Sequence, residues 1–294
     1  MIVKFENEFL EVLSSSHGGE LISIKGKKDN VEYLWTADSK YWGRHAPILF
    51  PIVGRVKDNK YRVEEKEFEL GQHGFARDYE FDLLENKDNT IVYRLVSSEE
   101  SLKKYPYKFQ LDIEYKLYKN MLKVTYKVKN IDNEKIYFTI GAHPGFNCPL
   151  IKGEDFEDYY LEFNKNENAR RELLDKESLL FTGESELVLD NTNILKLSKN
   201  LFIQDALIFE NLNSNEVTLK SARNGKSISV NFEGFPYLGI WSKPNEAPLI
   251  CIEPWVGHAD PVDFNGDYRE KPGVISLDVG KEFTCDYCIF INQD

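Results

Sequence analysis

A two-residue alternation of apolar and polar side chains runs through most of the chain and constrains its fold more than any other feature. In LKVTYKVKN, Leu122, Val124, Tyr126 and Val128 alternate with polar residues. Successive side chains of a strand point to opposite faces, so the pattern predicts a strand with one buried face. FQLDIEYKLY precedes it across a KN turn, and KIYFTIGA follows NIDNE. We expect these three segments to form an antiparallel meander.

The alternation recurs along the chain and predicts more than a dozen strands. It is seen in EFLEVLSS, GELISIKG, KYRVEEKEFEL, EFDLLE, TIVYRLVSS, NEVTLKSA, KSISVNF, YLGIWS, LICIEPW, VISLDV and EFTCDYCIFI. Only ESLKKYP and ARRELLDKES are predicted to be helical, and residues 151–200 are expected to hold surface loops and a short helix. The prediction is an all-β fold, a large antiparallel β-sandwich.

Composition and charge restrict the class of protein. No linker divides the chain, so residues 1–294 are expected to form a single domain. No stretch approaches the roughly 18 apolar residues of a membrane span, and charges in MIVKFENEFLEV argue against a signal peptide, which predicts a cytoplasmic protein without a membrane partner. A net charge of −12 would repel nucleic acid and favours a small-molecule ligand. The four cysteines are expected to be reduced. A monomer or a homodimer is expected.

Two short motifs resemble functional sites, but the residues around them do not complete either motif. NGKS at 224–227 resembles the end of a phosphate loop, yet the first glycine of that pattern would fall at Lys220, and the flanks predict a hairpin turn. CDYC has metal-ligand spacing, but residues three apart on a strand point to opposite faces, and no second ligand pair completes a site. Buried thiols are expected there, and neither a metal nor a cofactor is predicted.

Three clusters place ionisable residues among glycines, prolines and aromatic residues. The clusters FPIVGRVKDNKY with GQHGFARD, GAHPGFN, and LICIEPWVGHAD present Arg55, His73 and Arg77, then His143, then Glu253, His258 and Asp260. Glu253 ends an apolar strand at Pro254, where a carboxylate is costly unless it is paired or used. A structural ion pair and a catalytic carboxylate both fit that position. His143 and His73 are equally compatible with structural or catalytic roles.

Taken together, the motifs resemble the aldose 1-epimerase (galactose mutarotase) family. The segments PILFPIVGR, QHGFARD, IGAHPGF, IQDALIFENL, YLGIWSKP and ICIEPWVGHAD follow one another in the family's order over nearly the whole chain. The resemblance is greatest to the LacX-like branch, which lies near the hexose-6-phosphate mutarotases. It implies a β-sandwich of the galactose mutarotase type, in agreement with the strand pattern.

The resemblance also implies roles for individual residues. The family's general base is a glutamate that matches Glu253, and its general acid is a histidine that matches His143. The histidine of the HG motif, which assists at the sugar oxygens, matches His73. Two residues that hold sugar hydroxyls match Arg55 and Asp205, the latter by position and by the apolar run that follows it. In this resemblance no metal or redox cofactor is needed.

The implied reaction is interconversion of the α and β anomers of an aldose. Ionised Glu253 would take the proton of the anomeric hydroxyl while protonated His143 gives one to the ring oxygen, so that the ring opens and then closes with the roles reversed. Trp241 is a candidate apolar face for the sugar ring. Phe75 and Phe146 fit either that role or the core.

The choice of substrate stays open at this point. HGFAR replaces a double-glycine pattern of the galactose enzymes, and IEPW replaces an LETQ-like pattern. Arg77, Lys243 and Arg55 raise a second hypothesis, in which guanidinium groups clamp a hexose 6-phosphate. A third hypothesis is a non-catalytic carbohydrate-binding sandwich, although a pure binder would not need both His143 and Glu253.

Overall fold

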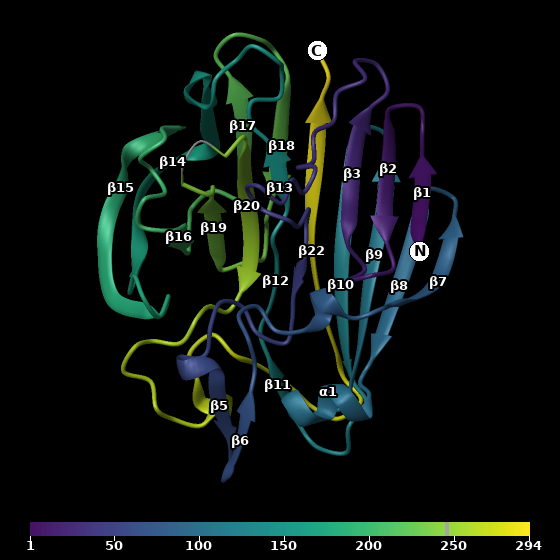
Figure 1. Cartoon of the computed structure of the whole chain (residues 1–294), viewed down its shortest axis with the longest axis vertical. Helices are drawn as coiled ribbons and strands as arrows, with labels where there is room; N and C mark the ends of the chain where they lie inside the picture. The colour runs from purple at the N-terminus through teal and green to yellow at the C-terminus, as the bar shows by residue number, and fades with distance from the viewer. Residues whose placement is uncertain (245–246) are drawn as a thin grey trace.

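The computed structural model describes residues 1–244 and 247–294, which form mainly antiparallel strands (Figure 1). The one helix of more than a single turn in this part is α1 (Glu99–Lys104), which begins after the N-cap Ser98. The strands are β1 (Ile2–Glu6), β2 (Leu10–Ser15), β3 (Leu21–Gly26), β4 (Ile48–Leu49), β5 (Lys60–Val63), β6 (Lys66–Glu69), β7 (Asp82–Lys87), β8 (Thr90–Val96), β9 (Phe109–Tyr118), β10 (Met121–Asn130), β11 (Ile136–Phe138), β12 (Ile140–Ala142), β13 (Gly145–Asn147), β14 (Tyr159–Leu174), β15 (Phe181–Lys196), β16 (Leu207–Glu210), β17 (Glu216–Ser221), β18 (Ser227–Asn231), β19 (Tyr237–Trp241), β20 (Leu249–Val256), β21 (Ile275–Leu277) and β22 (Glu282–Asn292). Short 3₁₀ turns occur at Lys57–Asn59, Ala76–Asp78, Phe156–Asp158 and Tyr268–Glu270.

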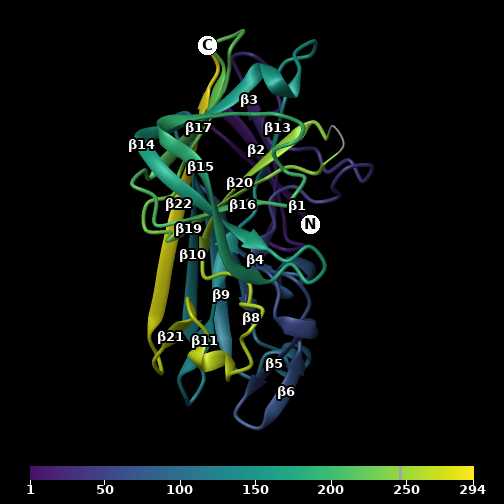
Figure 2. The same cartoon turned by 90° about the vertical axis from the view of Figure 1, so that its left-hand side faces the viewer.

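The predicted large antiparallel β-sandwich is confirmed. Most strands belong to one sheet of 15 strands, whose main path runs β4-β12-β20-β19-β16-β14-β17-β18-β22-β10-β9-β8-β7. A second sheet, β1-β2-β3, packs on its β8 and β9 end, where the hydroxyls of Ser14 and Tyr93 hydrogen bond at 2.8 Å and Tyr115 donates to the carbonyl of Gly19. Figure 2 shows the molecule from the side, with the β14–β15 hairpin toward the viewer.

The predicted meander is only partly correct. β9 and β10 pair as expected, and side chains alternate mostly between buried and partly exposed, except that Asp112 and Thr125 are buried as well. The other neighbour of β10 is β22, at the far end of the chain. The segment that was expected there divides into β11, which pairs with β21, and β12, which pairs with β20 and β4. Alternation specifies which face of a strand is buried but not which strand lies beside it.

Residues 151–200 differ from the prediction of loops and a helix. ARRELLDKES was expected to be helical, but its first six residues are the end of β14, which forms a long curved hairpin with β15 (Figure 1). Its residues are good helix formers, yet Glu167, Ala169 and Arg171 point inward with a period of two. Packing against the neighbouring strands therefore overrides local propensity. ESLKKYP does begin within α1, as predicted.

The two motifs that resembled functional sites, NGKS and CDYC, lie in a hairpin turn and in a strand. NGKS forms the turn between β17 and β18, which confirms the hairpin prediction. CDYC lies in β22, and its thiols, Cys285 and Cys288, are only partly buried rather than fully buried as expected.

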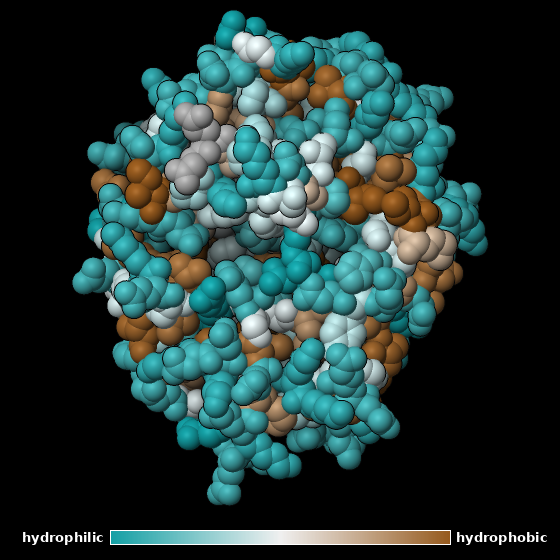
Figure 3. All heavy atoms as spheres, in the orientation of Figure 1, coloured by the Kyte–Doolittle hydropathy of each residue, from teal (hydrophilic) through white to brown (hydrophobic). Residues whose placement is uncertain are grey.

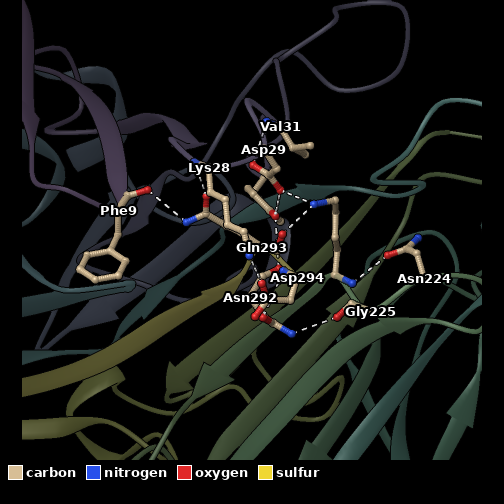
Figure 4. Close-up of polar contacts among 11 residues, drawn as sticks. Phe9, Lys28, Asp29, Val31, Asn224, Gly225, Asn292, Gln293 and Asp294 are labelled. Atoms are coloured by element: carbon tan, nitrogen blue, oxygen red, sulfur yellow. Dashed lines mark hydrogen bonds and ion pairs between the residues drawn. The ribbon is translucent and has the colours of Figure 1, made fainter.

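Hydrogen bonds hold the C-terminal residues against two distant loops (Figure 4). Lys226 donates to Asp29 at 2.6 Å and to the carbonyl of Gln293 at 2.9 Å, and Gln293 accepts from the amide of Lys28. Burial alone would raise the pKa of Asp29, but hydrogen bonds from Lys226 and Tyr33 outweigh it and hold the pKa below its ordinary value. These contacts connect the end of β22 with the loop that follows β3 and with the turn before β18.

The visible surface is mainly hydrophilic, with apolar residues in small separate groups (Figure 3). Exposed apolar residues that are scattered in this way are ordinary for a folded chain. None of the helices in the described ranges is long and apolar enough to cross a bilayer.

Candidate functional site

Six of the seven predicted site residues line one cavity of about 310 Å³. They come from segments far apart in the sequence: His73, Arg77, His143, Asp205, Trp241 and Glu253. The volume lies in the range of sites for small molecules. The seventh residue, Arg55, does not line the cavity.

Glu253 lies in β20, and its carboxylate is almost completely buried, with 1% of the residue exposed. In the pairing of β19 with β20, the residue opposite is Gly239. A Cβ atom at Gly239 would lie 2.7 Å from the indole ring of Trp255, so a side chain there would displace that ring from the cavity wall. Glycine at position 239 therefore leaves room for the Trp255 ring. Trp255 lies on the same face of β20 as Glu253, two residues away.

His143 follows β12 directly, and Pro144 interrupts the chain before β13. Its ring stacks on Trp42 with ring centres 4.8 Å apart and meets Trp241 edge-on at 6.0 Å. Its Nε2 atom lies 3.2 Å from the Oε2 atom of Glu253. The two indole rings hold the imidazole in one orientation, facing the carboxylate.

Burial disfavours the charged form of both partners in this pair. It lowers the pKa of His143 to about 3, with a further contribution from the positive charge of Arg77. Burial also raises the pKa of Glu253 well above its usual value, and the nearby carboxylate of Asp205 adds to that effect. Besides the N–H of the neutral imidazole, the pair can carry one titratable proton. Burial disfavours adding a further proton, which would make the pair positive, and disfavours removing the titratable one, which would make it negative. The pair therefore keeps one titratable proton over a wide range of pH.

His73 is fixed by backbone hydrogen bonds on both sides. Its amide donates to the carbonyl of Gly54 at 2.8 Å, and the amide of Gly54 donates to its Nδ1 atom at 3.1 Å. A backbone N–H can only donate, so Nδ1 carries no proton and the neutral ring is protonated at Nε2. Burial, His143 and the arginines lower its pKa and keep the ring neutral.

The neutral His73 presents a hydrogen-bond donor to the cavity. The side-chain nitrogen of Gln72 lies 3.3 Å from Nε2 of His73, and the amide oxygen of Gln72 accepts from Arg55. With a proton on Nε2, neither nitrogen can accept from the other. Both N–H groups are therefore available to donate to one ligand oxygen.

Arg77 and Asp205 add opposite charges to the cavity. Arg77 donates to the carbonyl of Gln72 at 2.7 Å, but its buried Nε–H has no partner among the described residues. Burial and the neighbouring Arg44 lower the pKa of Arg77 to about 10, which leaves it charged at neutral pH. Asp205 accepts the amide of Ala206 at 2.7 Å. Each has hydrogen-bonding capacity left for a polar ligand.

Comparison with known proteins identifies the family. The family model for aldose 1-epimerase matches residues 1–276. The plasmid-encoded protein LacX of Lactococcus lactis is 39% identical over 96% of this chain and 97% of its own. The chain belongs to the aldose 1-epimerase family. A galactose mutarotase related enzyme from Lactobacillus acidophilus superposes with a TM-score of 0.95 at 37% identity, over 100% of this chain and 98% of that one. A galactose mutarotase-like protein from Lactobacillus casei gives 0.93 at 33%, over 99% and 100%.

Membership of the aldose 1-epimerase family implies a small sugar as ligand, and the walls of the cavity suit one. Trp241 lines it, as expected from the sequence, together with Trp42, Trp255, Leu174 and Leu179, which the sequence did not single out. Trp255 was detectable, because it lies two residues beyond Glu253 on the same face of a strand. Trp42 comes from an irregular segment without periodicity, and no local signal marks it. Phe75 and Phe146 belong to the core.

Two of the three basic side chains that the phosphate hypothesis requires, those of Arg55 and Lys243, do not line the cavity. Lys243 lines a different pocket, and Arg55 reaches the cavity only through Gln72. The structure therefore does not bring Arg55, Arg77 and Lys243 together.

His258 and Asp260 do not line the cavity, but Asp260 hydrogen bonds to a loop that does. The buried amine of Lys271 lies 3.1 Å from Asp260, and Asp260 accepts the amide of Lys57 at 2.9 Å. The amide of Asp260 also donates to the carbonyl of Arg55, which fixes the loop that carries Gly54 and hence His73. His258 stacks on Phe181 with ring centres 4.6 Å apart.

Proposed function

We propose that this protein interconverts the α and β anomers of an aldose by acid and base catalysis. The observation that carries the proposal is the buried contact between His143 and Glu253, 3.2 Å apart on the wall of a cavity of sugar size. A site that only binds sugar gains nothing from a buried carboxylate and imidazole that share a proton. Family membership supports the same reaction.

In the proposed mechanism, the shared proton moves within the pair. Burial favours neutral Glu253 beside neutral His143, and transfer of one proton across their contact gives the ionised form without exchange with solvent. Glu253 then removes the proton of the anomeric hydroxyl as His143 gives its proton to the ring oxygen. The bond from C1 to the ring oxygen breaks, the aldehyde rotates about the C1–C2 bond, and closure returns both protons.

The other polar groups hold the sugar in the proposed complex. The N–H groups of His73 and Gln72 donate to a sugar oxygen, while Arg77 and Asp205 bind hydroxyl groups. Trp42 and Trp241 give the ring an apolar face. We propose a sugar without a phosphate, because only one of the three cations required by the phosphate hypothesis lines the cavity.

Saturation-transfer NMR on α-glucose and α-galactose, each with and without a 6-phosphate, tests this proposal. We expect anomer exchange above the buffer rate for at least one free sugar, and slower exchange for its 6-phosphate. Faster exchange of the 6-phosphates would favour the phosphate-clamp hypothesis. Exchange at the buffer rate for all four, with binding retained, would favour the carbohydrate-binding hypothesis.

The pH profile should show a wide plateau, because activity requires one proton on the pair. Below the lower limit a second proton charges the pair, and burial holds that limit far below an ordinary histidine, near the pKa of about 3 of His143. Above the upper limit the last proton leaves, and the raised pKa of Glu253 moves that limit upward. We expect kcat/KM to stay level from pH 5 to 7, over the range in which the chain is folded. An acid limb at the ordinary histidine pKa of about 6.5 would contradict the shared proton.

A further inference from the structure

A thiol lies directly behind the His143–Glu253 pair, and the reaction proposed above does not use it. Cys251 precedes Glu253 by two residues in β20, so both side chains point to the same face. His143 lies across from them, because Gly145, two residues after it, pairs with Cys251. One ring nitrogen of His143, the Cys251 sulfur and one Glu253 oxygen all lie within 4.8 Å of one another.

The polar atoms of this cluster lack hydrogen bonds of their own. Within the described part of the chain, Nδ1 of His143 and both carboxylate oxygens of Glu253 are buried and make no hydrogen bond. The 3.2 Å approach of Oε2 to Nε2 of His143 is a close contact that lacks hydrogen-bond geometry. A buried polar atom that is left unpaired destabilises the folded state. A ligand that satisfies several of them at once would recover that free energy.

We propose that His143, Cys251 and Glu253 form a binding site for a borderline-soft divalent cation such as Zn²⁺, and that the bound ion blocks the sugar site. Imidazole, thiolate and carboxylate are the donor types that zinc takes in proteins, and three protein ligands leave a fourth position for water. Here that position faces the cavity, since His143 and Glu253 line it. Donors around zinc lie roughly 3.5 Å apart, so the side chains need to move by about 1 Å.

The charges in the cluster balance with and without the ion. Without it, the buried Cys251 thiol is protonated at neutral pH, as an ordinary thiol is, and in the mechanism proposed above the His143–Glu253 pair holds one titratable proton. The cluster is then neutral. One Zn²⁺ displaces the thiol proton and the shared proton, which leaves a thiolate, a carboxylate and a neutral imidazole around a double positive charge. The cluster is neutral again, so binding buries no net charge and releases two protons.

The donor set also discriminates among metal ions. Mg²⁺ and Ca²⁺ prefer oxygen ligands and gain little from a thiolate, whereas Zn²⁺, Co²⁺ and Cu²⁺ bind nitrogen and sulfur donors well. Zinc should therefore compete with the sugar while magnesium does not.

Absorption spectroscopy with Co²⁺ tests the site directly, with Cys285→Ser/Cys288→Ser as the starting protein, so that these partly exposed thiols cannot bind the ion. This protein should show a thiolate-to-cobalt charge-transfer band that excess Zn²⁺ removes and Mg²⁺ does not. Adding Cys251→Ser should abolish the band and weaken zinc binding at least about tenfold. Adding Cys148→Ser, which removes another buried thiol, should leave both unchanged. Adding His143→Gln should keep the thiol but weaken zinc binding to a similar extent.

Two further measurements make the test decisive. Calorimetry in buffers of different ionisation enthalpy should report two protons released for each zinc ion bound. Zinc should also slow anomer exchange in the starting protein, and much less in the Cys251 variant, relative to the metal-free rate of each. Absence of the cobalt band, or a band that survives Cys251→Ser, would overturn the metal site. The band does not depend on catalysis, so it would report the site even if no sugar were converted.

Discussion

Glu253→Gln is expected to lower kcat for anomer exchange by about 10²–10⁴, with a smaller change in KM. Glutamine keeps the shape of the side chain but cannot take a proton from the anomeric hydroxyl. The effect should fall on kcat, because the proton is transferred only in the transition state. Anomer exchange measured by saturation-transfer NMR over a range of sugar concentrations separates the two parameters.

The same substitution should not destabilise the protein, which distinguishes lost chemistry from lost structure. The folded-state pKa of Glu253 is raised, so ionisation of the unfolded chain above pH 4.5 favours unfolding. This penalty grows with pH until the folded carboxyl also ionises and stays at its maximum above that pH. Glutamine has no such penalty. We expect the variant to match or exceed the parent in thermal midpoint at pH 7, and its advantage to disappear near pH 4.

Glu167→Gln is a matched control for the loss of a buried carboxylate. Glu167 is also buried, but it accepts the amides of Asn213 and Ser214 and does not line the cavity. Glutamine would place an N–H group against these donors, so this variant should lose stability and keep its kcat. Equal losses of kcat in the two variants would mean that Glu253 acts through the fold.

The sequence predicted the class of fold because alternation is a local property of each strand. It did not predict strand order: β10 pairs with β22, and nothing in LKVTYKVKN specifies a partner so far along the chain. The helix expected at ARRELLDKES failed because inward-facing Glu167 and Arg171 conceal the alternation of β14. Polar residues on a buried face find their partners only in the tertiary structure.

The site was predictable where an ionisable residue interrupts an apolar run. Glu253 and His143 both do so, and the structure places them in contact. The expectation that the strand ends at Pro254 was wrong, because β20 continues through Pro254 to Val256. Charge alone was a poor guide, since Arg55 and Lys243 lie away from the cavity although each stands next to a glycine or a proline. The ring that orients His143, Trp42, depends on a contact between distant segments, which no local pattern encodes.

His143→Gln is expected to lower kcat by about 10²–10⁴ as well, because an amide cannot give a proton to the ring oxygen and regain it at closure. His258→Gln is the matched control: His258 is another buried histidine in the same region, but it stacks on Phe181 and does not line the cavity. Its substitution should change the thermal midpoint more than kcat. Equal losses of kcat would indicate a structural role for both histidines.

The double variant His143→Gln/Glu253→Gln tests whether the two residues act as one unit. In the proposed mechanism one proton passes between the two groups, whose Nε2 and Oε2 atoms lie 3.2 Å apart, so removing either group already prevents that transfer. We therefore expect the double variant to lose no more activity than the poorer single variant, rather than the product of the two losses. Losses that multiply would mean that the two groups work on separate protons, each exchanged with solvent. The wide pH plateau would then have no basis, since each group would titrate independently.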